Sequence, residues 1–592
     1  MTEKFRTWAN ARTERTTPAR AEVTLQEAFG RAGGTWHAVL AEESQGRVEE
    51  ILGAERGPIL PELFLTLAAS LLLRVGAIVA TTERWGYPTL REQRRWLSVA
   101  TAGRTRCLRV PAGFWGLAVG GPESYQGLSG EEHQRLRQWG EEKELWGAKL
   151  VQDPLSVRAK RLLAAATAAC LVGRRDTLKR TRRFALEYPV LRLFALLGGR
   201  LLASANDLLI LYLALELQSL SLYVLAAFRR GSAYSTEAGL KYFVLGAFAS
   251  GLYLFGCSLV YGSRGTTNFG ELALLLPTGA LGEARTGPVV AGFTLIVAAF
   301  LFKLTAAPYH RWGPDVREGS PTASGRFFAA VAKLGVLVAL ARLCWVPFHG
   351  VRGHRTDRRR AVAALSRVVG SLAALRQRRW KRFRAYSTVG HRGYLVRALG
   401  TRSGAGLEAF LLYRLVYTVR SLNVWSTRRS LRRVVSTERP WDGGEGARVQ
   451  TRNVTWRSEL AGLGTAKPAV AFTLAAARFS RAGIPPRAGF RAKYLALTAA
   501  LEAGRWKLSI LAILTAVVGA FYYLRWIKVR FFESVRETVQ WAPIARENSL
   551  VRLVSLAIRV LLRVQPAEVL KVIHRAAEVY GEPTVVVGSG GH

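Results

Sequence analysis

Cysteine and acidic residues are scarce in this chain of 592 residues. Its four cysteines are isolated, with no C-x-x-C pair and no metal-ligand spacing, which excludes a disulfide framework and an iron–sulfur site. The sequence also lacks the glycine-rich dinucleotide fingerprint, the phosphate-binding P-loop and the H-E-x-x-H zinc motif. The chain therefore has no recognisable site for a nucleotide, a flavin or a metal cluster, and we do not expect electrons to pass through it.

Apolar runs of about twenty residues, the length of a membrane-spanning helix, recur along the chain. The clear runs are Ile59–Ala80, Ala205–Phe228, Gly239–Gly262, Val289–Ala307, Thr322–Val346 and Leu508–Leu524. The weaker runs are Leu155–Gly173, Tyr188–Ala203, Val362–Leu375, Ala385–Leu399, Leu407–Leu422, Lys467–Ala482, Ala488–Ala503 and Val551–Val564. This pattern predicts an all-α integral membrane protein with roughly a dozen or more spans.

The charge balance points elsewhere, because 85 Lys and Arg residues against 41 Asp and Glu residues leave a formal net charge of +44. Such an excess is typical of proteins that bind nucleic acids or anionic lipids. Many of the arginines, however, lie inside the apolar runs: Arg74, Arg192, Arg200, Arg397, Arg414, Arg420 and Arg478. An unpaired arginine costs about 2.5 to 3.5 kcal/mol at a helix centre. A nucleic-acid-binding protein would instead carry basic faces with interleaved aromatic residues on otherwise polar helices. The arginine pattern therefore argues against that class.

Methionine is missing except at Met1, although it is an ordinary filler of apolar cores. We therefore interpret the two anomalies together. Many recorded arginines would be positions where the physical protein carries Met or Leu, through a variant codon assignment or an altered transcript. While these residues are in question, the positive-inside rule gives no orientation.

The chain divides by composition into four parts. Residues 1–58 form a polar, arginine-rich extension, and residues 59–150 contain the first spans and a charged loop. Residues 151–535 carry the regular apolar pattern, and residues 536–592 are expected to form a C-terminal helix and tail.

The stretch Phe302–Lys333 is the most informative part of the core. The uncharged run Val289–Leu301 precedes Lys303, and Pro308, Pro314 and Pro321 follow it. Backbone groups freed by proline cannot face lipid, so the interrupted helix must line protein or a water-filled cavity. An ionisable residue at such a break is a candidate transport residue.

A second proline break repeats this arrangement further along the chain. The sequence Gly-Ile-Pro-Pro begins at Gly483, and Lys493 follows it within another apolar region. Two interrupted segments in corresponding positions of two halves are typical of transporter folds.

Several strings in the core match a known family. They include NDLL from Asn206, LYLALELQSLSLYV from Leu211, STEAGLKYFVLGAF from Ser235, PYH from Pro308, WGPDV from Trp312, AYSTVGHRGYL from Ala385 and FSRAGIPPRAGFRAK from Phe479. These strings closely resemble the chain 2 family of respiratory NADH:ubiquinone oxidoreductase, complex I. The resemblance covers about residues 150–535. In that family the positions of Arg311, Arg481 and Arg487 are commonly apolar, which agrees with the substitution hypothesis.

The resemblance implies about fourteen transmembrane helices, with two Pro-broken helices related as an inverted repeat. It implies a proton-translocating membrane-arm subunit of complex I, which couples NADH-to-ubiquinone electron transfer in other subunits to pumping. No cofactor is expected on this chain, and NADH, FMN, iron–sulfur clusters and ubiquinone are expected in partner subunits. The expected partners are other membrane-arm subunits and the lipid bilayer, not nucleic acid. The expected location is the mitochondrial inner membrane or, alternatively, a bacterial plasma membrane. A cation/proton antiporter subunit is the alternative with the same fold.

Proton relay requires groups that change charge at moderate cost, and arginine does not, because it stays protonated. The candidates are Glu216, Lys241, Lys303, Lys333, Lys493, His310 and His391. The resemblance implies that Glu216 is the family's fifth-helix glutamate, paired with Lys241 or Lys303. It also implies that Lys303, Lys333 and Lys493 belong to the first broken helix, its successor and the second broken helix.

Each candidate also has a structural interpretation. Lys241 lies four residues after Glu237, and this pair could simply stabilise a first helical turn. Lys303 could be a snorkelling side chain at a helix end. His310 and His391 could be interior hydrogen-bonding residues with no part in transport.

Overall fold

The computed structural model describes residues 62, 65–67, 69–70, 143–145, 148–173, 187–276, 283–348, 354–401, 403–436, 449–485, 487–533 and 540–581. The chain separates into two units, Met1–Leu63 and Phe64–His592. The fold described below is that of the second unit. The predicted extension over residues 1–58 and most of the predicted span Ile59–Ala80 lie outside the described residues.

The first half of the second unit is built from helices, together with one small strand pair that precedes them. In chain order the elements are β1 (Lys143–Leu145), β2 (Leu150–Gln152), α7 (Pro154–Val172), α9 (Glu187–Ser204), α10 (Leu208–Ala227), α11 (Ala233–Arg264), α12 (Phe269–Leu275), α13 (Glu283–Leu304), α14 (Trp312–Gly319), α15 (Thr322–Ala330) and α16 (Ala332–Trp345).

The second half continues with long helices and a second strand pair. Its elements are α17 (His354–Arg376), α18 (Trp380–Gly400), α19 (Gly404–Arg429), β3 (Arg432–Ser436), β4 (Val449–Asn453), η3 (Ser458–Leu460), α20 (Leu463–Ala466), α21 (Pro468–Ala482), α22 (Ala488–Glu502), α23 (Trp506–Phe531), α24 (Arg546–Val564) and α25 (Pro566–Gly581). The strand pair is antiparallel, with Arg432 opposite Asn453 and Ser436 opposite Val449.

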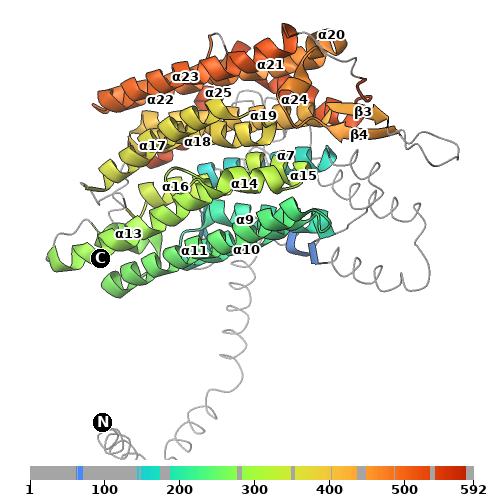
Figure 1. Cartoon of the computed structure of the whole chain (residues 1–592). Helices are drawn as coiled ribbons and strands as arrows, with labels where there is room; N and C mark the ends of the chain where they lie inside the picture. Colours follow the sequence, from blue (N-terminus) through green and yellow to red (C-terminus); the bar gives the residue numbers. More distant parts are fainter. Residues whose placement is uncertain are drawn as a thin grey trace, which may run out of the picture. The chain divides into compact units, whose positions relative to one another are not determined.

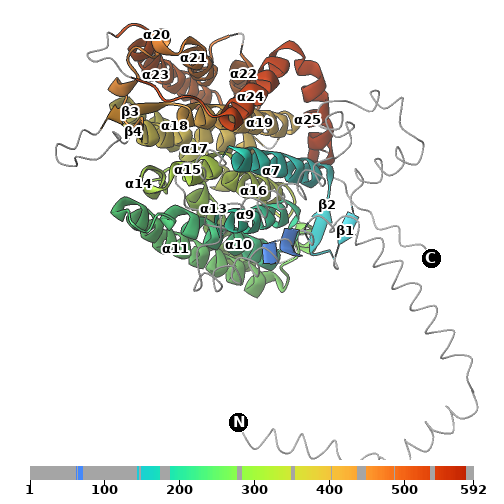
Figure 2. The same cartoon turned by 90° about the vertical axis from the view of Figure 1, so that its right-hand side faces the viewer.

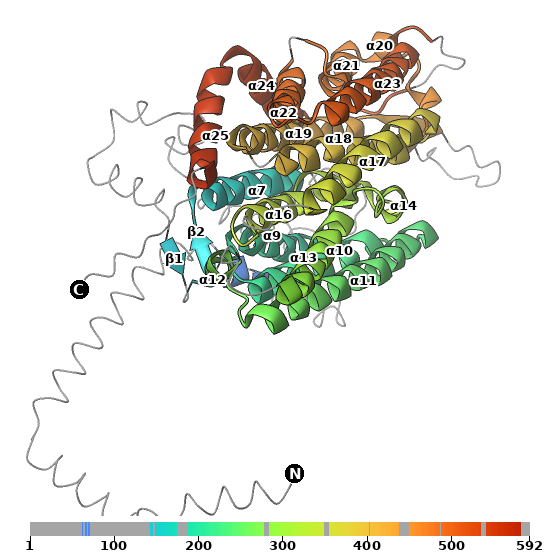
Figure 3. The same cartoon turned by 90° about the vertical axis from the view of Figure 1, so that its left-hand side faces the viewer.

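The helices of the second unit follow one another in space much as they do in sequence (Figure 1). Helices α9, α10, α11 and α13 pack together, and α21, α22 and α23 form a second group, with α17, α18 and α19 between them. Two late helices depart from this order: α24 and α25 both contact α19 (Figure 2), and α25 also reaches α7 (Figure 3). The C-terminal helices therefore connect α19 with α7, which is the first long helix of the described fold.

Local sequence explains where the functional helices begin and end. The Asp207 side chain accepts hydrogen bonds from the backbone N–H groups of Leu209 and Ile210, and so caps the N-terminus of α10. Helix α21 ends at Gly483, whose φ of +86° is the left-handed conformation that glycine adopts most easily.

Helices α11 and α13 approach closely at a pair of glycines. A Cβ atom on Gly256 would lie 2.6 Å from the carbonyl oxygen of Gly292, and one on Gly292 would lie 2.6 Å from the carbonyl oxygen of Gly256. No larger residue fits at either position without moving a backbone. This approach fixes α13, which carries Lys303, against α11.

Both predicted helix interruptions are present. Helix α13 ends at Leu304 and α14 begins at Trp312, and α21 ends at Ala482 before α22 begins at Ala488. Thr305, the first residue after α13, has a φ of +57°. The first broken region is longer than the prolines alone suggest, because the chain is interrupted once more at Val331, between α15 and α16.

Five segments in the described part of the chain are long and apolar enough to cross a membrane: Leu208–Ala227, Ala233–Arg264, Gly287–Leu304, Thr322–Trp345 and Trp506–Phe531. All five coincide with clear runs of the sequence. Of the weaker runs, Ala385–Leu399 lies in α18 and Leu407–Leu422 lies in α19. The protein is thus a helical protein of membrane type, and the two small sheets in the described residues are the exception to the all-α prediction.

Candidate functional site: two lysine cavities

Glu216 lies in the middle of α10, between leucines, where a carboxylate has few polar neighbours. Its side chain is 22% exposed, and it accepts hydrogen bonds from the hydroxyls of Ser219 and Ser250. Ser250 comes from α11, so the carboxylate joins two helices.

Lys303 lies in the last turn of α13 and is buried. Its Nζ atom is 3.8 Å from Oε1 of Glu216. The same nitrogen donates hydrogen bonds of 3.2 Å to Tyr223 Oη and Ser250 Oγ. The predicted partner of Glu216 is therefore Lys303 in this structure, and Ser250 contacts both members of the pair.

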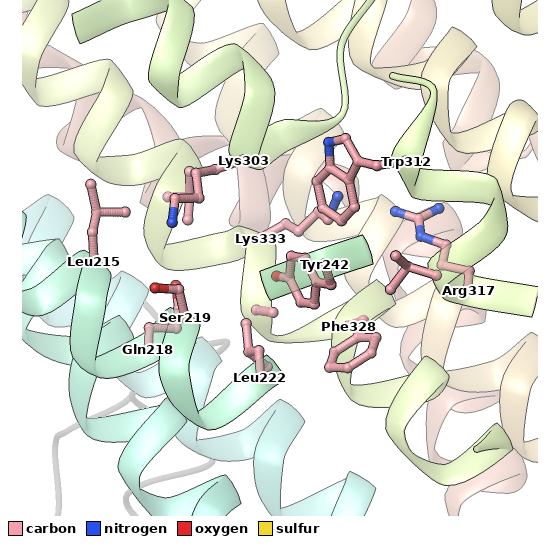
Figure 4. Close-up of a pocket in the computed structure, with 13 residues that line it drawn as sticks. Leu215, Gln218, Ser219, Leu222, Tyr242, Lys303, Trp312, Arg317, Phe328 and Lys333 are labelled. Carbon is pink, nitrogen blue, oxygen red and sulfur yellow. The ribbon is translucent and has the colours of Figure 1, made fainter. Parts of the chain in front are cut away.

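Lys333 lines the same cavity as Lys303, together with Trp312 and Tyr242 (Figure 4). It lies in the first turn of α16 and is buried. Its Nζ atom donates hydrogen bonds to the carbonyl oxygen of Leu304, at 3.3 Å, and to the hydroxyl of Thr305, at 3.2 Å. The two predicted lysines are thus brought together at the first helix break.

A second cavity contains Lys493 and His391. Lys493 is buried on α22, and its Nζ atom donates a 2.7 Å hydrogen bond to the carbonyl oxygen of Ala482. The ammonium also lies 5.5 Å from the ring centroid of Tyr394. The second helix break therefore has a buried lysine of its own.

Tyrosine hydroxyls hold both nitrogens of the His391 ring. Nδ1 is 2.6 Å from Tyr413 Oη, and Nε2 is 3.2 Å from Tyr523 Oη. Tyr523 in turn hydrogen-bonds with Ser387. His391 is therefore the centre of a hydrogen-bonded series of side chains that connects α19, α18 and α23.

The two breaks share one arrangement. Leu304 is the last residue of α13 and Ala482 is the last residue of α21, and each offers its carbonyl oxygen to a buried lysine. The C-terminal carbonyls of a helix have no partner within the helix and carry partial negative charge. A lysine there is held without a full counter-charge, so its proton is not locked in an ion pair.

Two predicted residues lie away from both cavities. Lys241 is exposed and forms an ion pair with Glu237 on its own helix, as the structural interpretation expected, but the pair lies beyond the first turn because α11 begins at Ala233. His310 is half-buried, and its Nδ1 atom is 3.2 Å from the carbonyl oxygen of Pro308. Neither residue lines the Lys303 or the Lys493 cavity, and their relay role stays a prediction.

Sequence reasoning missed the neutral polar members of the site. These residues are Tyr223, Ser250, Thr305, Tyr413 and Tyr523. The signal that could have found them is a hydroxyl inside an apolar run, on a helix next to a predicted lysine. No group of metal-ligating side chains occurs among the residues that the structure describes.

The interior arginines named from the sequence are mostly buried. Arg192, Arg397, Arg414, Arg420 and Arg478 are all buried, Arg200 is half-buried, and Arg74 lies outside the described residues. The apolar runs therefore pack in the interior despite these residues.

Comparison with known families accounts for this arrangement of broken helices and lysines. Residues 205–519 match the family model described as NADH:quinone oxidoreductase/Mrp antiporter, transmembrane. The chain belongs to this family. The matched residues include both helix breaks, the first cavity and the second cavity except Tyr522 and Tyr523.

Similar members of the NADH:quinone oxidoreductase/Mrp antiporter family span most of the chain. NADH-ubiquinone oxidoreductase chain 2 of Marchantia polymorpha is 33% identical over 88% of this chain and 97% of its own length. NADH-quinone oxidoreductase subunit N of Paramagnetospirillum magneticum is 38% identical over 74% of this chain and 87% of its own length.

Solved structures of the family agree with the fold. A chain of respiratory complex I from Thermus thermophilus superposes with a TM-score of 0.62 at 28% identity, covering 85% of this chain and 98% of that one. A chain of the Mrp complex from Dietzia has a TM-score of 0.67 at 19% identity, covering 88% of this chain and 98% of that one, which shows a shared fold alone.

Proposed function

We propose that this chain is a proton-translocating membrane-arm subunit of complex I. The names of the similar family members support this assignment, since they are chain 2 and subunit N of NADH:quinone oxidoreductases. In this proposal the translocating core is residues 151–535. The whole chain has the family's arrangement of about fourteen spans, and its two broken helices are related as an inverted repeat.

The observation that carries the proposal is the repeated setting of buried lysines. Lys333 and Lys493 each bind the final carbonyl oxygen of an interrupted helix and each line a cavity. Ionisable groups buried in membrane-type helices are costly and mark ion or proton pathways. A purely structural lysine would not require a cavity beside it.

The Glu216–Lys303 pair is the switch in the mechanism that we propose. A nearby carboxylate favours the protonated lysine, whereas burial favours the neutral one. Displacement of the Glu216 carboxylate, driven by redox events in other subunits, makes Lys303 release its proton. Return of the carboxylate makes Lys303 take up the next proton.

The released proton passes to Lys333, which shares the cavity with Lys303. From there it travels through water toward Lys493 and His391 in the second cavity. Arginines near this route cannot replace the lysines, because the guanidinium does not give up its proton. Lys303, Lys333 and Lys493 are accordingly the relay residues, with His391 as their partner.

The chain acts without a cofactor of its own, and the redox groups and ubiquinone belong to partner subunits. Its partners are other membrane-arm subunits and the lipid bilayer. Relatives come from a mitochondrion-bearing plant and from bacteria, and we place this chain in an energy-coupling membrane, the mitochondrial inner membrane or a bacterial plasma membrane.

Proton stoichiometry in the intact complex tests this function. The complex is reconstituted in vesicles, and protons moved per NADH oxidised are measured for Lys303→Met and Lys493→Met. We expect both substitutions to lower the ratio strongly, because each removes a relay lysine from one cavity. Unchanged stoichiometry in both variants would refute the proposal.

Lys241→Met is the matched control. Lys241 is also a lysine on a membrane-type helix, but it is exposed and paired with Glu237 outside both cavities. We infer from this exposed pair that Lys241 supports its own helix and does not relay protons, so we expect normal stoichiometry and normal assembly from this variant. Equal loss from Lys241→Met and Lys303→Met would show that removal of any lysine disturbs the complex.

Cation/proton antiport is the second candidate, since the family model includes the Mrp antiporters. It predicts sodium-dependent proton movement in vesicles without NADH. Absence of such movement, together with NADH-dependent pumping, favours the complex I function.

A further inference from the structure

Two buried arginines lack hydrogen-bond acceptors among the described residues. Arg478 on α21 and Arg530 on α23 are both completely buried, with a relative exposure of 0%. In the part of the chain that the structure describes, none of the three guanidinium nitrogens of either residue has a hydrogen-bond partner. A guanidinium carries five donors and a permanent charge, so each site buries an unsatisfied ion.

The surroundings of Arg478 are aromatic. Its guanidinium carbon lies 4.6 Å from the ring centroid of Trp380, 4.8 Å from that of Phe383 and 5.0 Å from that of Trp526. Phe383 and Trp526 also stack on one another, with centroids 4.7 Å apart. A sealed pocket of stacked rings is a usual site for a Met thioether or a Leu side chain.

Cation–π attraction does not by itself explain Arg478. The charged groups that act on it most strongly are Arg530, Arg481 and Arg384, all of the same sign. A desolvated cation next to like charges, with no acceptor, is the arrangement that folded proteins avoid.

Arg359 on α17 has the same deficiency, since it is buried and its three guanidinium nitrogens have no hydrogen-bond partner among the described residues. Arg342 on α16 is the opposite case. It is equally buried, yet its Nη2 atom lies 2.6 Å from Oδ1 of the buried Asp153. The fold thus supplies an acceptor for one buried arginine and none for the other three.

We propose that positions 359, 478 and 530 carry an apolar residue, Leu or Met, in the mature protein. The structure selects these positions by their missing acceptors, independently of any resemblance and of the proposed function. Arg367 lacks acceptors in the same way, but its guanidinium lines the second cavity and lies 3.7 Å from the ring centroid of Tyr394, so it is not included. The single methionine of the chain agrees with this proposal, because a helical interior of this size ordinarily uses methionine to fill irregular gaps. Arg342, Arg379 and Arg382, which form ion pairs, remain arginines.

Peptide mass spectrometry of the purified native complex decides the question. Chymotryptic peptides that end at Phe479, Phe531 and Trp345 contain positions 478, 530 and 342. We expect the mass of leucine or methionine at 478 and 530, and the mass of arginine at 342. Arginine at both 478 and 530 overturns the proposal.

Trypsin provides a second readout, because it cleaves after arginine. In the denatured chain we expect cleavage after position 342 and none after positions 359, 478 and 530. Sequencing the transcript then separates the two sources. A transcript that encodes Leu or Met shows an edited message, and an unchanged transcript with an apolar peptide shows a reassigned codon.

A different observation carries a second proposal, which rests on the proposed function. The neutral imidazole of His391 has one donor and one acceptor nitrogen, so one of its two tyrosine partners donates to the ring and the other accepts. Tyr413 also stacks on Tyr394, with ring centroids 5.7 Å apart, and Tyr394 lies beneath the Lys493 ammonium.

We infer that Tyr523 is a positioning residue for proton transfer in the second cavity. It holds the Nε2 side of His391 toward the cavity, while Ser387 fixes the tyrosine hydroxyl. A proton that arrives through one tyrosine hydroxyl adds to the acceptor nitrogen of His391, and the imidazolium then releases the proton of its other nitrogen to the second hydroxyl, which passes its own proton on. The ring is left in its other tautomer with both hydrogen bonds reversed, and it must return to the first tautomer before the next proton. Without this hydroxyl the ring is free to turn away from the path.

Tyr523→Phe tests the inference, because it removes one oxygen from a packed ring. In reconstituted complex we expect fewer protons per NADH, with the NADH oxidation rate and the assembled amount unchanged. A purely structural role would lower assembly and both activities together. Tyr494→Phe is the control, since Tyr494 lies on α22 with 53% exposure.

The possible results distinguish a failure of the Tyr523 inference from a failure of the proposed proton-translocating function. Normal stoichiometry in Tyr523→Phe, with loss in Lys493→Met, overturns the role of Tyr523 alone. Normal stoichiometry in both variants removes the proposed pathway as well.

Discussion

The Nζ atom of Lys303 and the Oε1 atom of Glu216 lie 3.8 Å apart, and the hydroxyl of Ser250 contacts both side chains. This separation is at the outer limit of an ion pair. The pair is therefore loose and partly bridged, which suits a charge that must part from its partner. Three separate helices, α10, α11 and α13, supply the three groups.

Glu216→Gln removes the charge of the pair and keeps an acceptor for Ser250. We expect proton stoichiometry to fall strongly, because Lys303 then lacks the carboxylate that attracts its proton. The double variant Glu216→Gln/Lys303→Met should pump no worse than Lys303→Met alone, since residues in one network are not additive. Additive losses measured in vesicles would contradict the pairing.

Glu237→Gln is the matched control for this carboxylate. It breaks the exposed ion pair with Lys241 on α11. Exposed ion pairs contribute little to stability, because solvent screens them. We therefore expect near-normal stability and stoichiometry, and a loss equal to that of Glu216→Gln would show that the assay reports general damage.

Ser250→Ala tests the bridge in this pair. The substitution removes the hydroxyl that contacts Glu216 and Lys303, and it leaves the two charges in place. We expect a smaller loss of stoichiometry than Glu216→Gln gives, because the direct attraction remains. Ser258→Ala is the control, since its hydroxyl bonds only to the backbone of its own helix among the contacts described. A loss as large as that of Lys303→Met would show that the hydroxyl itself relays the proton.

The charged residues of the site could be predicted from the sequence, but their pairing could not. Glu216, Lys303 and Lys493 stand out because each lies in an apolar run. The choice between Lys241 and Lys303 as the partner of Glu216 depends on how α11 and α13 pack, and the Gly256–Gly292 contact that sets this packing has no local signature.

The neutral groups were harder for a physical reason. Serine and threonine in helices often bond to a carbonyl four residues earlier, as Ser221 does with Leu217. Ser250 makes the same kind of bond to Gly246 and also reaches Glu216. Sequence alone cannot distinguish a hydroxyl that only serves its helix from one that also serves the site.

Helix ends were predicted less well than helix positions. The run Leu407–Leu422 marks α19 correctly, but the helix extends from Gly404 to Arg429. Arginine has a high helix propensity, so the arginines beyond the apolar run do not end the helix. The predicted run was too short, because it ended before the charged residues that continue the helix.

Thr305 joins a strained backbone to the Lys333 site. Its φ of +57° is uncommon for a β-branched residue, and strain of this kind costs about 1 to 3 kcal/mol. Thr305→Gly should relieve that strain, and it also removes the hydroxyl that accepts hydrogen bonds from Lys333 and from the buried Arg392. We expect proton stoichiometry to fall, and we expect thermal stability of the same purified complex to change little, because the relieved strain offsets the lost hydrogen bonds.

Thr305→Ser is the companion variant, because it keeps the hydroxyl and removes the methyl group. It should retain most of the stoichiometry. If Thr305→Gly pumps normally, the hydroxyl has no part in holding Lys333 for transfer. If Thr305→Gly is much less stable than both the parent and Thr305→Ser, the hydroxyl that Arg392 and Lys333 share outweighs the backbone strain.

Asp153 and Arg342 give a prediction about stability alone. Asp153 caps α7 by accepting a 2.8 Å hydrogen bond from Ser156 N, and it pairs with Arg342 in the interior. Removal of one partner of a buried pair typically costs about 3 to 5 kcal/mol, because the other charge stays buried. Asp153→Asn keeps the capping acceptor and removes the charge, so thermal unfolding of the purified complex should shift to clearly lower temperature.

Two further variants separate the charge from the cap. Ser156→Ala removes the reciprocal hydrogen bond to Asp153 N and should cost only about 1 kcal/mol. Asp153→Asn/Arg342→Met removes both charges and should recover most of the loss, since no unpaired charge is then left buried and the asparagine at position 153 still caps α7. If the double variant is as unstable as Asp153→Asn, the damage comes from the polar contacts of Asp153 and not from the stranded charge of Arg342.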